Sequence, residues 1–298
     1  MKLSAKHRIL RALSHQKWMI GRSRILRAFA HPERQESFPF EVDFFGRSYS
    51  GNLTNFIDWT VFFYGAYTRH ELLLLAAIAD RLRARGRPIN FFDVGANVGH
   101  HSMFMSGHAD KVFAFEPFSV VRSEMARKLG HANVGNVEIF PVALGDRNET
   151  ASYHPPLGAN TATGTLSDYL PPNAAAEVIP VEVARGDDFF AANNLPPISL
   201  LKIDVEGYEA KVLEGMHQTL LRDRPPILME IHGPSRSGFK TLERLKSLLY
   251  PDHLLFEAIP SRRRHFGLKP FSMGGPTDIT EALVLPSDLA GFARDSAG

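Results

Sequence analysis

Residues 91–101 read Phe-Phe-Asp-Val-Gly-Ala-Asn-Val-Gly-His-His. The stretch begins apolar, as a buried parallel strand does, and then breaks into a loop that holds two glycines and an asparagine. A helix-compatible run follows at 102–105. A strand, a glycine-containing turn and a helix together place a nucleotide-like ligand over the N-terminus of the helix. Gly95 and Gly99 would let the backbone approach that ligand without a Cβ in the way.

The order of residues in this turn separates two kinds of cofactor site. A pyrophosphate site uses the order Gly-x-Gly-x-x-Gly, whereas Gly95, Asn97 and Gly99 give Gly-x-Asn-x-Gly. Asp93 stands two residues before the first glycine. A carboxylate repels a pyrophosphate but attracts a cationic ligand, such as the ammonium and sulfonium of S-adenosylmethionine (SAM). We therefore expect a SAM site, with a nicotinamide site or an ordinary tight turn as the alternatives.

Two further acids follow later strands. The strand 111–115 ends in Glu116, where a carboxylate can accept hydrogen bonds from both ribose hydroxyls of a cofactor. Asp146 follows a third strand, at 137–144, and could accept a hydrogen bond from an adenine amine. An acid in a solvated turn is the alternative for Asp146. We expect both acids to belong to the cofactor site.

The apolar strand 198–205 carries charged residues towards its end. Lys202, Asp204 and Glu206 occupy every second position, so they would point to one face of the strand. Three charges on one face of an apolar strand are costly unless partners or a ligand meet them. A charge network that only ties the strand end down is one interpretation. The functional interpretation places Asp204 against the transferred group and the substrate, with Glu206 and Lys202 setting its charge and position.

Glu230 and His232 lie at the end of the next apolar strand, 226–231. We expect His232 to be a candidate general base, although a lone histidine is more often structural. Asp204, Glu230 and His232 could instead bind magnesium or manganese, because hard oxygens and one imidazole suit those ions. The metal-free interpretation is preferred. Nor is a joint metal site expected at the adjacent histidines 100 and 101, which do not share one face of a helix.

The composition of the 298-residue chain, with 44% hydrophobic and 22% charged residues, is that of an ordinary soluble globular protein. No run approaches the ~20 uninterrupted apolar residues of a transmembrane helix. The chain contains no cysteine, which excludes disulfides, thiolate catalysis and cysteine-ligated zinc, and which fits a reducing compartment.

Strand and helix patterns alternate through the centre of the chain. This alternation predicts an α/β fold with a mostly parallel sheet, helices on both faces, and ligands at the carboxyl ends of the strands. The spacing of Thr68 and Glu71 predicts a capping box before a helix over 72–82. The other expected elements are helices at 119–129 (with Val120 turned inward), 187–193, 208–220 and 239–249, and strands at 178–184, 254–259 and 280–285. The polar segment 147–175 is expected to be a lid or disordered.

The N-terminal region differs in charge from the rest of the chain. Residues 1–34 hold nine Lys or Arg and one acid, so they carry +8 and the remainder carries −6. Residues 1–31 predict one or two basic, partly amphipathic helices, which could pack on the body of the protein, contact an anionic membrane or a partner, or form a transit peptide. The aromatic pattern over 38–63 predicts short strands and a hairpin. We expect an accessory segment at 1–66 and a catalytic domain at 67–298.

These motifs resemble the FkbM-type family of SAM-dependent methyltransferases. The matching stretches are 92–99 (Phe-Asp-Val-Gly-Ala-Asn-Val-Gly), 115–117 (Phe-Glu-Pro), 143–145 (Ala-Leu-Gly) and, most specifically, 201–209 (Leu-Lys-Ile-Asp-Val-Glu-Gly-Tyr-Glu). The resemblance covers roughly residues 90–235. It is partial at 185–188, where the family usually shows Thr-Leu-Asp, and at 100–101, where the family often carries an aromatic residue and a threonine.

The resemblance implies a class I, Rossmann-like fold with a seven-stranded sheet and O-methylation of a hydroxyl on a sugar, a glycan or a natural product. It also implies that Pro117 and Ala143 belong to the cofactor site with the acids and the glycine loop described above. The implied cofactor-binding set is therefore Asp93, Gly95, Asn97, Gly99, Glu116, Pro117, Ala143 and Asp146.

The sequence as a whole predicts a SAM-dependent O-methyltransferase. A hydroxyl oxygen would displace the methyl group in line while Asp204 or His232 takes its proton. A nicotinamide-dependent oxidoreductase and a non-catalytic SAM-binding module are the alternatives. We expect a small-molecule or glycan acceptor, no nucleic-acid partner, and a cytoplasmic location with peripheral contact between residues 1–31 and an anionic inner membrane surface.

Overall fold

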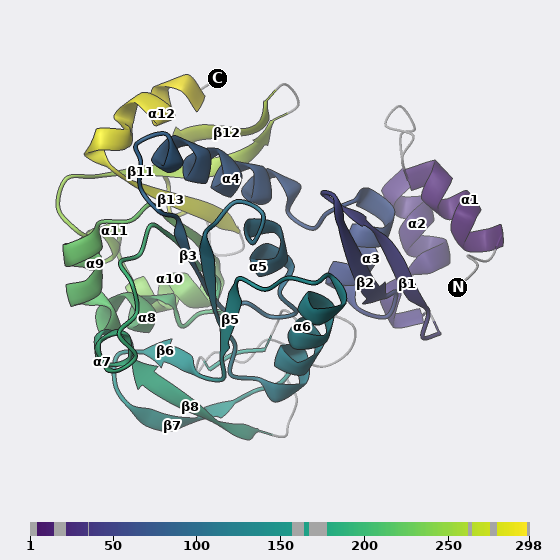
Figure 1. The fold of residues 1–298 in the computed structure, drawn as a ribbon, viewed down its shortest axis with the longest axis horizontal. Coiled ribbons are helices and arrows are strands. Elements are labelled where there is room, and N and C mark those ends of the chain that lie inside the picture. The colour runs from purple at the N-terminus through teal and green to yellow at the C-terminus, as the bar shows by residue number, and fades with distance from the viewer. Residues whose placement is uncertain are drawn as a thin grey trace.

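The structure is a computed structural model that describes residues 5–14, 22–34, 36–156, 164–166, 178–261, 264–274 and 279–296. Its centre is an eight-stranded sheet with the strand order β12-β11-β13-β10-β9-β3-β4-β5 (Figure 1). In that order the strands are His265–Pro270, His253–Ser261, Thr280–Pro286, Ile227–Ile231, Leu200–Ile203, Asn90–Val94, Lys111–Phe115 and Val137–Phe140. The predicted α/β fold with a large central sheet is confirmed.

Five consecutive strands, from the edge strand β5 to β10, run parallel. β5, β4, β3, β9 and β10 pair in parallel, so their carboxyl ends share one edge. β13, β11 and β12 follow in antiparallel pairs. The expectation of seven strands is corrected to eight among the described residues, because β12 forms a hairpin with β11. Glycine and proline, which are uncommon inside strands, hid β12 in the sequence.

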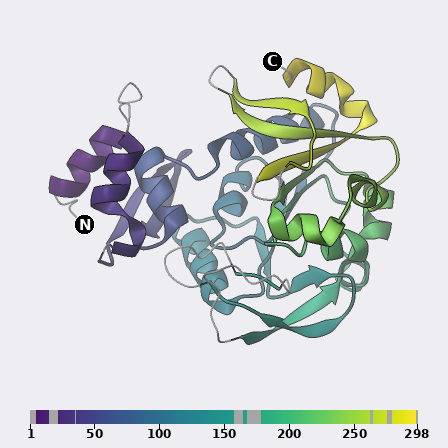
Figure 2. The ribbon, with the colours of Figure 1, turned by 180° about the vertical axis from the view of Figure 1, so that it is seen from behind.

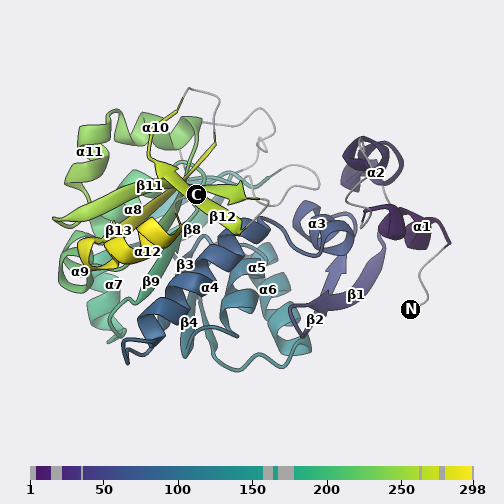
Figure 3. The ribbon, with the colours of Figure 1, turned by 90° about the horizontal axis from the view of Figure 1, so that it is seen from above.

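Alternate strand residues pack into two cores on opposite faces of the sheet. One core holds Phe91, Val112 and Leu200, and the other holds Phe92, Phe113 and Leu201. The first core is covered by α4 (Arg69–Arg83), α5 (His100–Met105), α6 (Ser119–His131) and α12 (Ala290–Ser296), of which α4 and α12 lie side by side in Figure 3. The second is covered by α7 (Gly186–Ala192), α8 (Glu209–Gly215), α9 (His217–Asp223), α10 (Gly233–Phe239) and α11 (Leu242–Ser247).

A second, three-stranded sheet corrects the prediction of one strand over 137–144. That stretch divides into β5 and β6 (Ala143–Gly145), which belong to different sheets, and the break falls at Pro141, which has no N–H for a ladder. β6 pairs in parallel with β8 (Ile179–Arg185), which also pairs with β7 (Glu149–Tyr153). β7 lies within the segment 147–175 that was expected to be a lid or disordered, and residues 157–163 and 167–175 of that segment lie outside the described residues.

The N-terminal region forms a compact group of elements at one end of the molecule (Figure 2). The predicted helices are α1 (Ala5–Ser14) and α2 (Arg22–Ala30), and the predicted hairpin is β1 (Pro39–Phe44) with β2 (Arg47–Asn52). The aromatic residues that follow form α3 (Phe56–Tyr64), not a strand. The side chain of Asn55 caps α3 by accepting hydrogen bonds from the N–H groups of residues 57 and 58.

Three helix predictions are corrected. Thr68, with a φ of 40°, makes no side-chain capping bond to α4. Val120, near the start of α6, is exposed instead of buried. The helix expected over 239–249 is the shorter α11, because α10 already ends at Phe239, Lys240 adopts a φ of 65°, and Thr241 is the N-cap of a new helix. Among the helices of the described ranges, none is long and apolar enough to cross a membrane.

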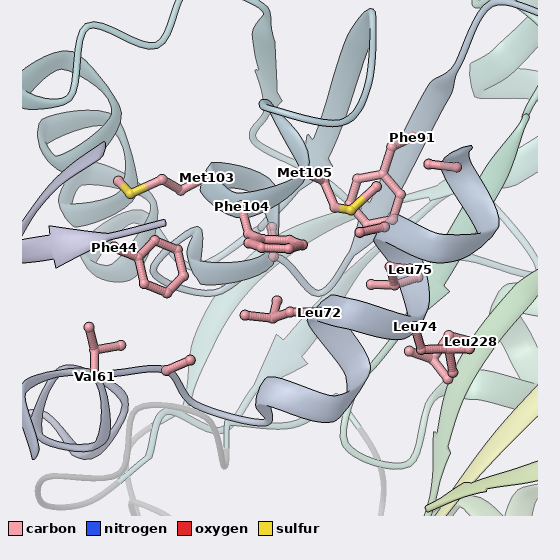
Figure 4. Close-up of a cluster of buried hydrophobic side chains, with 14 of the residues drawn as sticks. Phe44, Val61, Leu72, Leu74, Leu75, Phe91, Met103, Phe104, Met105 and Leu228 are labelled. Atoms are coloured by element: carbon pink, nitrogen blue, oxygen red, sulfur yellow. The ribbon is translucent and has the colours of Figure 1, made fainter. Parts of the chain in front are cut away.

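The N-terminal elements and the sheet share one continuous core. Phe44 of β1 and Val61 of α3 pack into the same buried cluster as Leu72, Met103 and Phe104 (Figure 4). These side chains come from both sides of residue 66. The accessory segment therefore shares its hydrophobic core with the rest of the chain.

A buried ion pair ties the N-terminal elements to α6. The ammonium of Lys128 contacts the carboxylate of Asp58 and donates a hydrogen bond to the hydroxyl of Tyr49 at 3.0 Å. That hydroxyl donates to Asp58 at 2.7 Å, and the backbone N–H of Asn52 donates to the other carboxylate oxygen at 2.8 Å. Removing one member of such a pair leaves an uncompensated buried charge.

We therefore expect Lys128→Met to lower the free energy of unfolding by about 3–5 kcal/mol, the range for breaking a buried pair. Urea denaturation would measure the change, with Lys111→Met, at an exposed lysine of β4, as the matched control. The double variant Lys128→Met/Asp58→Asn should recover part of the loss, because it removes the stranded charge. An unfolding midpoint of Lys128→Met equal to that of the control would contradict this account.

Candidate active site

A cavity opens at the carboxyl edge of the parallel strands. Residues from six segments line it: the ends of β3 and β4 with the residues after them, the residues after β9, β6, the end of β7, and residues 164 and 166. Among the predicted site residues it gathers Gly95, Asn97, Glu116, Pro117, Ala143, Asp204 and Glu206. Tyr153, Leu166 and Tyr208 add an apolar wall that the sequence analysis did not single out. The two informative sequence motifs therefore meet at one cavity, as the parallel topology requires.

The loop after β3 can take its path only with glycine at two positions. Gly95 has a φ of 81°, and a Cβ there would lie 1.8 Å from the backbone oxygen of Asp204. Gly99 has a φ of 79°, and a Cβ would lie 2.6 Å from the side chain of Met125. Gly99 does not line the cavity; its role is to fit the loop against α6. The close approach at Gly95 is to the protein backbone at the end of β9, whereas the approach predicted from the glycines was to a ligand.

Glu116 holds the glycine loop and the following helix together. One carboxylate oxygen accepts a hydrogen bond from the backbone N–H of Asn97 at 2.9 Å, and the other accepts from the N–H of Phe118 at 2.8 Å. Burial raises the pKa of Glu116 to about 7, although these N–H groups oppose the rise. Each carboxylate oxygen can accept a second hydrogen bond, and Glu116 lines the cavity, so it can still receive donors from a ligand.

Asp93, Lys202 and Asp204 form a buried charge bridge behind the cavity. The ammonium of Lys202 lies 3.5 Å from a carboxylate oxygen of Asp93 and 3.3 Å from one of Asp204. Ser102 donates a hydrogen bond to the other oxygen of Asp93 at 2.7 Å. Burial alone would lower the pKa of Lys202, but Asp204, Asp93 and Glu71 raise it above its usual value. Asp93, which was expected to face the cofactor, is not among the residues that line the cavity.

The expectation that Lys202, Asp204 and Glu206 share one face is correct for the first two only. β9 ends at Ile203, and Glu206 adopts a φ of 53° in the turn that follows. The turn directs its carboxylate to His232, whose Nε2 lies 3.0 Å away. Alternation applies inside a strand and fails where the strand stops.

His232 lies between two acids at the end of β10. Its Nε2 is 3.0 Å from a carboxylate oxygen of Glu206 and 3.9 Å from one of Glu230, and its Nδ1 is 3.5 Å from the hydroxyl of Ser235. Burial lowers the pKa of His232, but the hydrogen bond and charge of Glu206 raise it above its usual value. Burial, then the charges of Asp204 and Glu281, raises the pKa of Glu230 to about 11. His232 does not line the cavity.

Asp146 follows β6 and is likewise absent from the cavity lining. Its Oδ1 atom is buried and has no hydrogen-bond partner among the described protein atoms. Residues 143 and 144, just before it, do line the cavity. A buried acceptor without a donor beside such a cavity fits a ligand that brings its own N–H group.

The sequence analysis did not assign a site role to several residues that border this charge cluster. Glu71 of α4, expected as a capping residue, is buried with an oxygen 3.3 Å from the Nε2 of His101. The backbone N–H of Tyr67 donates to the Nε2 of His100 at 3.2 Å. Glu281 lies opposite Glu230 in the β10–β13 register. Of these, only Glu281 had a signal, as a lone acid in an apolar strand.

Known proteins resemble this chain over the part that holds the residues lining the cavity. A profile of the methyltransferase FkbM domain matches residues 93–258. The hexuronic acid methyltransferase AglP of Haloferax volcanii is 28% identical over 142 residues, which cover 47% of this chain and 55% of that protein. The 2-O-methyltransferase NoeI of Sinorhizobium fredii is 29% identical over 147 residues, which cover 44% of this chain and 59% of that protein. The chain thus spans little more than half the length of these two relatives.

A longer relative and a solved structure were also found. The AMB antimetabolite synthetase AmbE of Pseudomonas aeruginosa is 29% identical over 174 residues, which cover 47% of this chain but only 8% of that protein. A methyltransferase FkbM structure from Methylobacillus flagellatus superposes with a TM-score of 0.42 at 14% identity, covering 66% of this chain and 43% of that one. Because the domain profile covers more than half of the chain, including the glycine loop, Glu116 and the Lys202–Asp204 strand end, this protein belongs to the FkbM family of methyltransferases.

Proposed function

We propose that this protein is a SAM-dependent O-methyltransferase that methylates a hydroxyl of a sugar, a glycan or a natural product. The observation that carries the proposal is the cavity in which the Gly95 loop, Glu116 and Asp204 meet. The names of two relatives support a sugar acceptor, since one is a hexuronic acid methyltransferase and the other a 2-O-methyltransferase.

The residues at the cavity fit SAM in three respects. Gly95 lines the cavity without a Cβ, so a ligand can come close to the backbone of the loop there. Glu116 offers acceptor positions for ribose hydroxyls, and the unpartnered Oδ1 of Asp146 offers one for an adenine amine. Asp93 adds negative charge behind the loop, as a cationic ligand would favour. SAM supplies an electrophilic methyl group when it is bound.

Asp204 is the residue best placed to take the proton of the acceptor hydroxyl. Its side chain is 30% exposed and lines the cavity, whereas His232 does not line it and has Nε2 bonded to Glu206. Lys202 fixes the orientation of Asp204 through the contact at 3.3 Å. A neutral alcohol is a weak nucleophile, so removal of its proton and alignment of the oxygen would supply the rate enhancement.

A nicotinamide-dependent oxidoreductase is the competing function. Both cofactors carry a ribose that Glu116 could bind, but a pyrophosphate would face the carboxylate of Asp204 at the cavity, with that of Asp93 behind the loop. Calorimetric titrations with SAM and with NAD separate the two functions directly.

Glu116→Ala should weaken SAM binding by about 1.5–3 kcal/mol, the usual range for hydrogen bonds to a charged group, which is roughly a 10- to 150-fold rise in the dissociation constant. Isothermal titration calorimetry would measure it. The matched control is Glu138→Ala, at an exposed acid of the neighbouring strand β5. SAM affinity unchanged in Glu116→Ala, with NAD now bound, would favour the oxidoreductase.

Asp204→Asn should keep SAM affinity within a few-fold but reduce turnover by about 10²–10⁴-fold, the usual contribution of general acid–base catalysis. The substitution preserves shape and removes the proton-accepting charge. Transfer of labelled methyl from SAM to a panel of sugar and natural-product acceptors would measure it. If Asp204→Asn turned over like the wild type while His232→Gln did not, the proton acceptor would be His232.

We further propose that α1 and α2 hold the protein peripherally at an anionic membrane, on the cytoplasmic side. Ile9 and Phe29, 61% and 64% exposed, stand among the exposed arginines 8, 24 and 27. Neither helix has an acid in its first turn. Each Lys or Arg near an anionic surface contributes roughly 1 kcal/mol to attraction, and a lipid-linked acceptor would then lie close to the enzyme.

Deleting residues 1–31 would not test this contact cleanly, because Leu10, Leu26 and Ala30 are buried in the main core. The charge reversal Arg8→Glu/Arg27→Glu keeps these contacts. The wild type should sediment with anionic vesicles at low salt and be released at high salt, since salt screens exposed charges. The charge-reversed variant should stay in solution, and the matched control Lys246→Glu/Arg294→Glu should sediment. If the wild type does not sediment with the vesicles at low salt, the membrane contact is contradicted and the two helices serve only to pack on the rest of the protein.

A further inference from the structure

Three side chains of the kinds that bind metals meet beside the cavity. Glu206 comes from the turn after β9, Glu230 from β10, and His232 from the residue after β10. One ligand atom of each lies within 4.8 Å of the others. The Nε2 of His232 is 3.0 Å from Glu206 and 3.9 Å from Glu230. Two hard carboxylate oxygens and one imidazole nitrogen can therefore reach a common point.

The acidic side chains around this point outnumber the cationic ones. In the described part of the chain, the ion pairs of Glu206 and Glu230 both run to His232. Lys202, the buried ammonium at the same edge of the sheet, is engaged by Asp93 and Asp204. Glu281 of β13 is directly opposite Glu230, and such residues project from the same face of an antiparallel pair. A single imidazole thus faces three acids.

His232 is also held in an orientation that suits a ligand. Its Nδ1 lies 3.5 Å from the hydroxyl of Ser235, on the opposite side of the ring from the two acids. An outer partner on one ring nitrogen is the arrangement that orients a metal-ligating histidine, because it leaves the other nitrogen directed at the ion.

We infer that Glu206, Glu230 and His232 bind one divalent cation of the magnesium or manganese class. Carboxylates suit both ions, and Mn²⁺ is the better probe because its binding can be followed by electron paramagnetic resonance. The protein supplies three donors, which leaves positions for water or for a hydroxyl of the acceptor. That last role rests on the proposed function; the binding of the cation itself does not. The cation would hold the acceptor oxygen while Asp204, at the cavity, takes its proton.

The test is a titration of Mn²⁺ into full-length protein freed of metal with EDTA and then of EDTA by dialysis. Electron paramagnetic resonance measures free Mn²⁺, because the bound ion loses its sharp signal. We expect one saturable site per chain, displaced by excess Mg²⁺. In Glu230→Gln and His232→Gln the dissociation constant should rise at least about tenfold, since each removes one of three ligands. The control is Glu214→Gln, at a half-buried acid of α8 that pairs with Arg244 of α11. This control should bind Mn²⁺ as the wild type does.

Absence of a saturable site in the wild type would overturn the inference and leave His232 as a counter-ion of the two acids. So would a Glu230→Gln variant that binds Mn²⁺ as the wild type does. Folding of the variants is verified by calorimetric SAM binding in the presence of EDTA, and a variant that fails it is replaced by Glu206→Gln, judged by the same criterion. SAM binding without Mn²⁺ binding would retain the proposed function and discard this inference. Mn²⁺ binding without SAM binding would retain this inference and discard the proposed function.

Discussion

The buried ammonium of Lys202 is the interaction on which the arrangement of the active site depends. It lies between Asp93 of β3 and Asp204 after β9, so it joins the ends of two neighbouring parallel strands. Charges removed from water are stable only with partners, and here one cation serves two acids. The same bridge turns Asp204 to the side where it borders the cavity, while its backbone oxygen closes on Gly95. A change of Lys202 would therefore disturb the strand ends, the glycine loop and the proposed proton acceptor at once.

Glu116 has a comparable role on the other side of the cavity. Its two oxygens join the loop after β3 to the segment after β4 through hydrogen bonds from the backbone N–H groups of Asn97 and Phe118. The contacts of Lys202 and of Glu116 thus hold the loops after β3, β4 and β9 next to one another. Tyr153, Leu166 and Tyr208 form the apolar wall of the cavity. The acid that we propose to bind ribose is first of all the acid that shapes the loop. The two N–H groups also stabilise the buried carboxylate of Glu116, which no described cationic side chain contacts directly.

Sequence patterns predicted the elements that depend on neighbouring residues. They did not predict which distant segments pair or come into contact. The strand, glycine loop and helix around Gly95 need only local patterns, as does the helix after Glu116. Pro141 divides one apolar run between two sheets, and no periodicity shows that the second half pairs with β8. Glu206 leaves the face of Lys202 because β9 stops at Ile203, which the apolar run did not reveal. Glu281 was visible as an acid among apolar residues, but only the β10–β13 register places it opposite Glu230.

The N-terminal region packs against the elements that carry the glycine loop. The sequence suggested a boundary at residue 66, yet Tyr67 and Thr68 lead from α3 to His100 and His101 beside the glycine loop. Phe44 and Val61 pack with the α5 residues Met103 and Phe104, and Lys128 binds Asp58 across the same contact. A displacement of α3 would therefore reach the cofactor loop through packed side chains and a buried ion pair. In this chain the region before the methyltransferase motifs packs against the elements that hold the glycine loop, although none of its described residues lines the cavity.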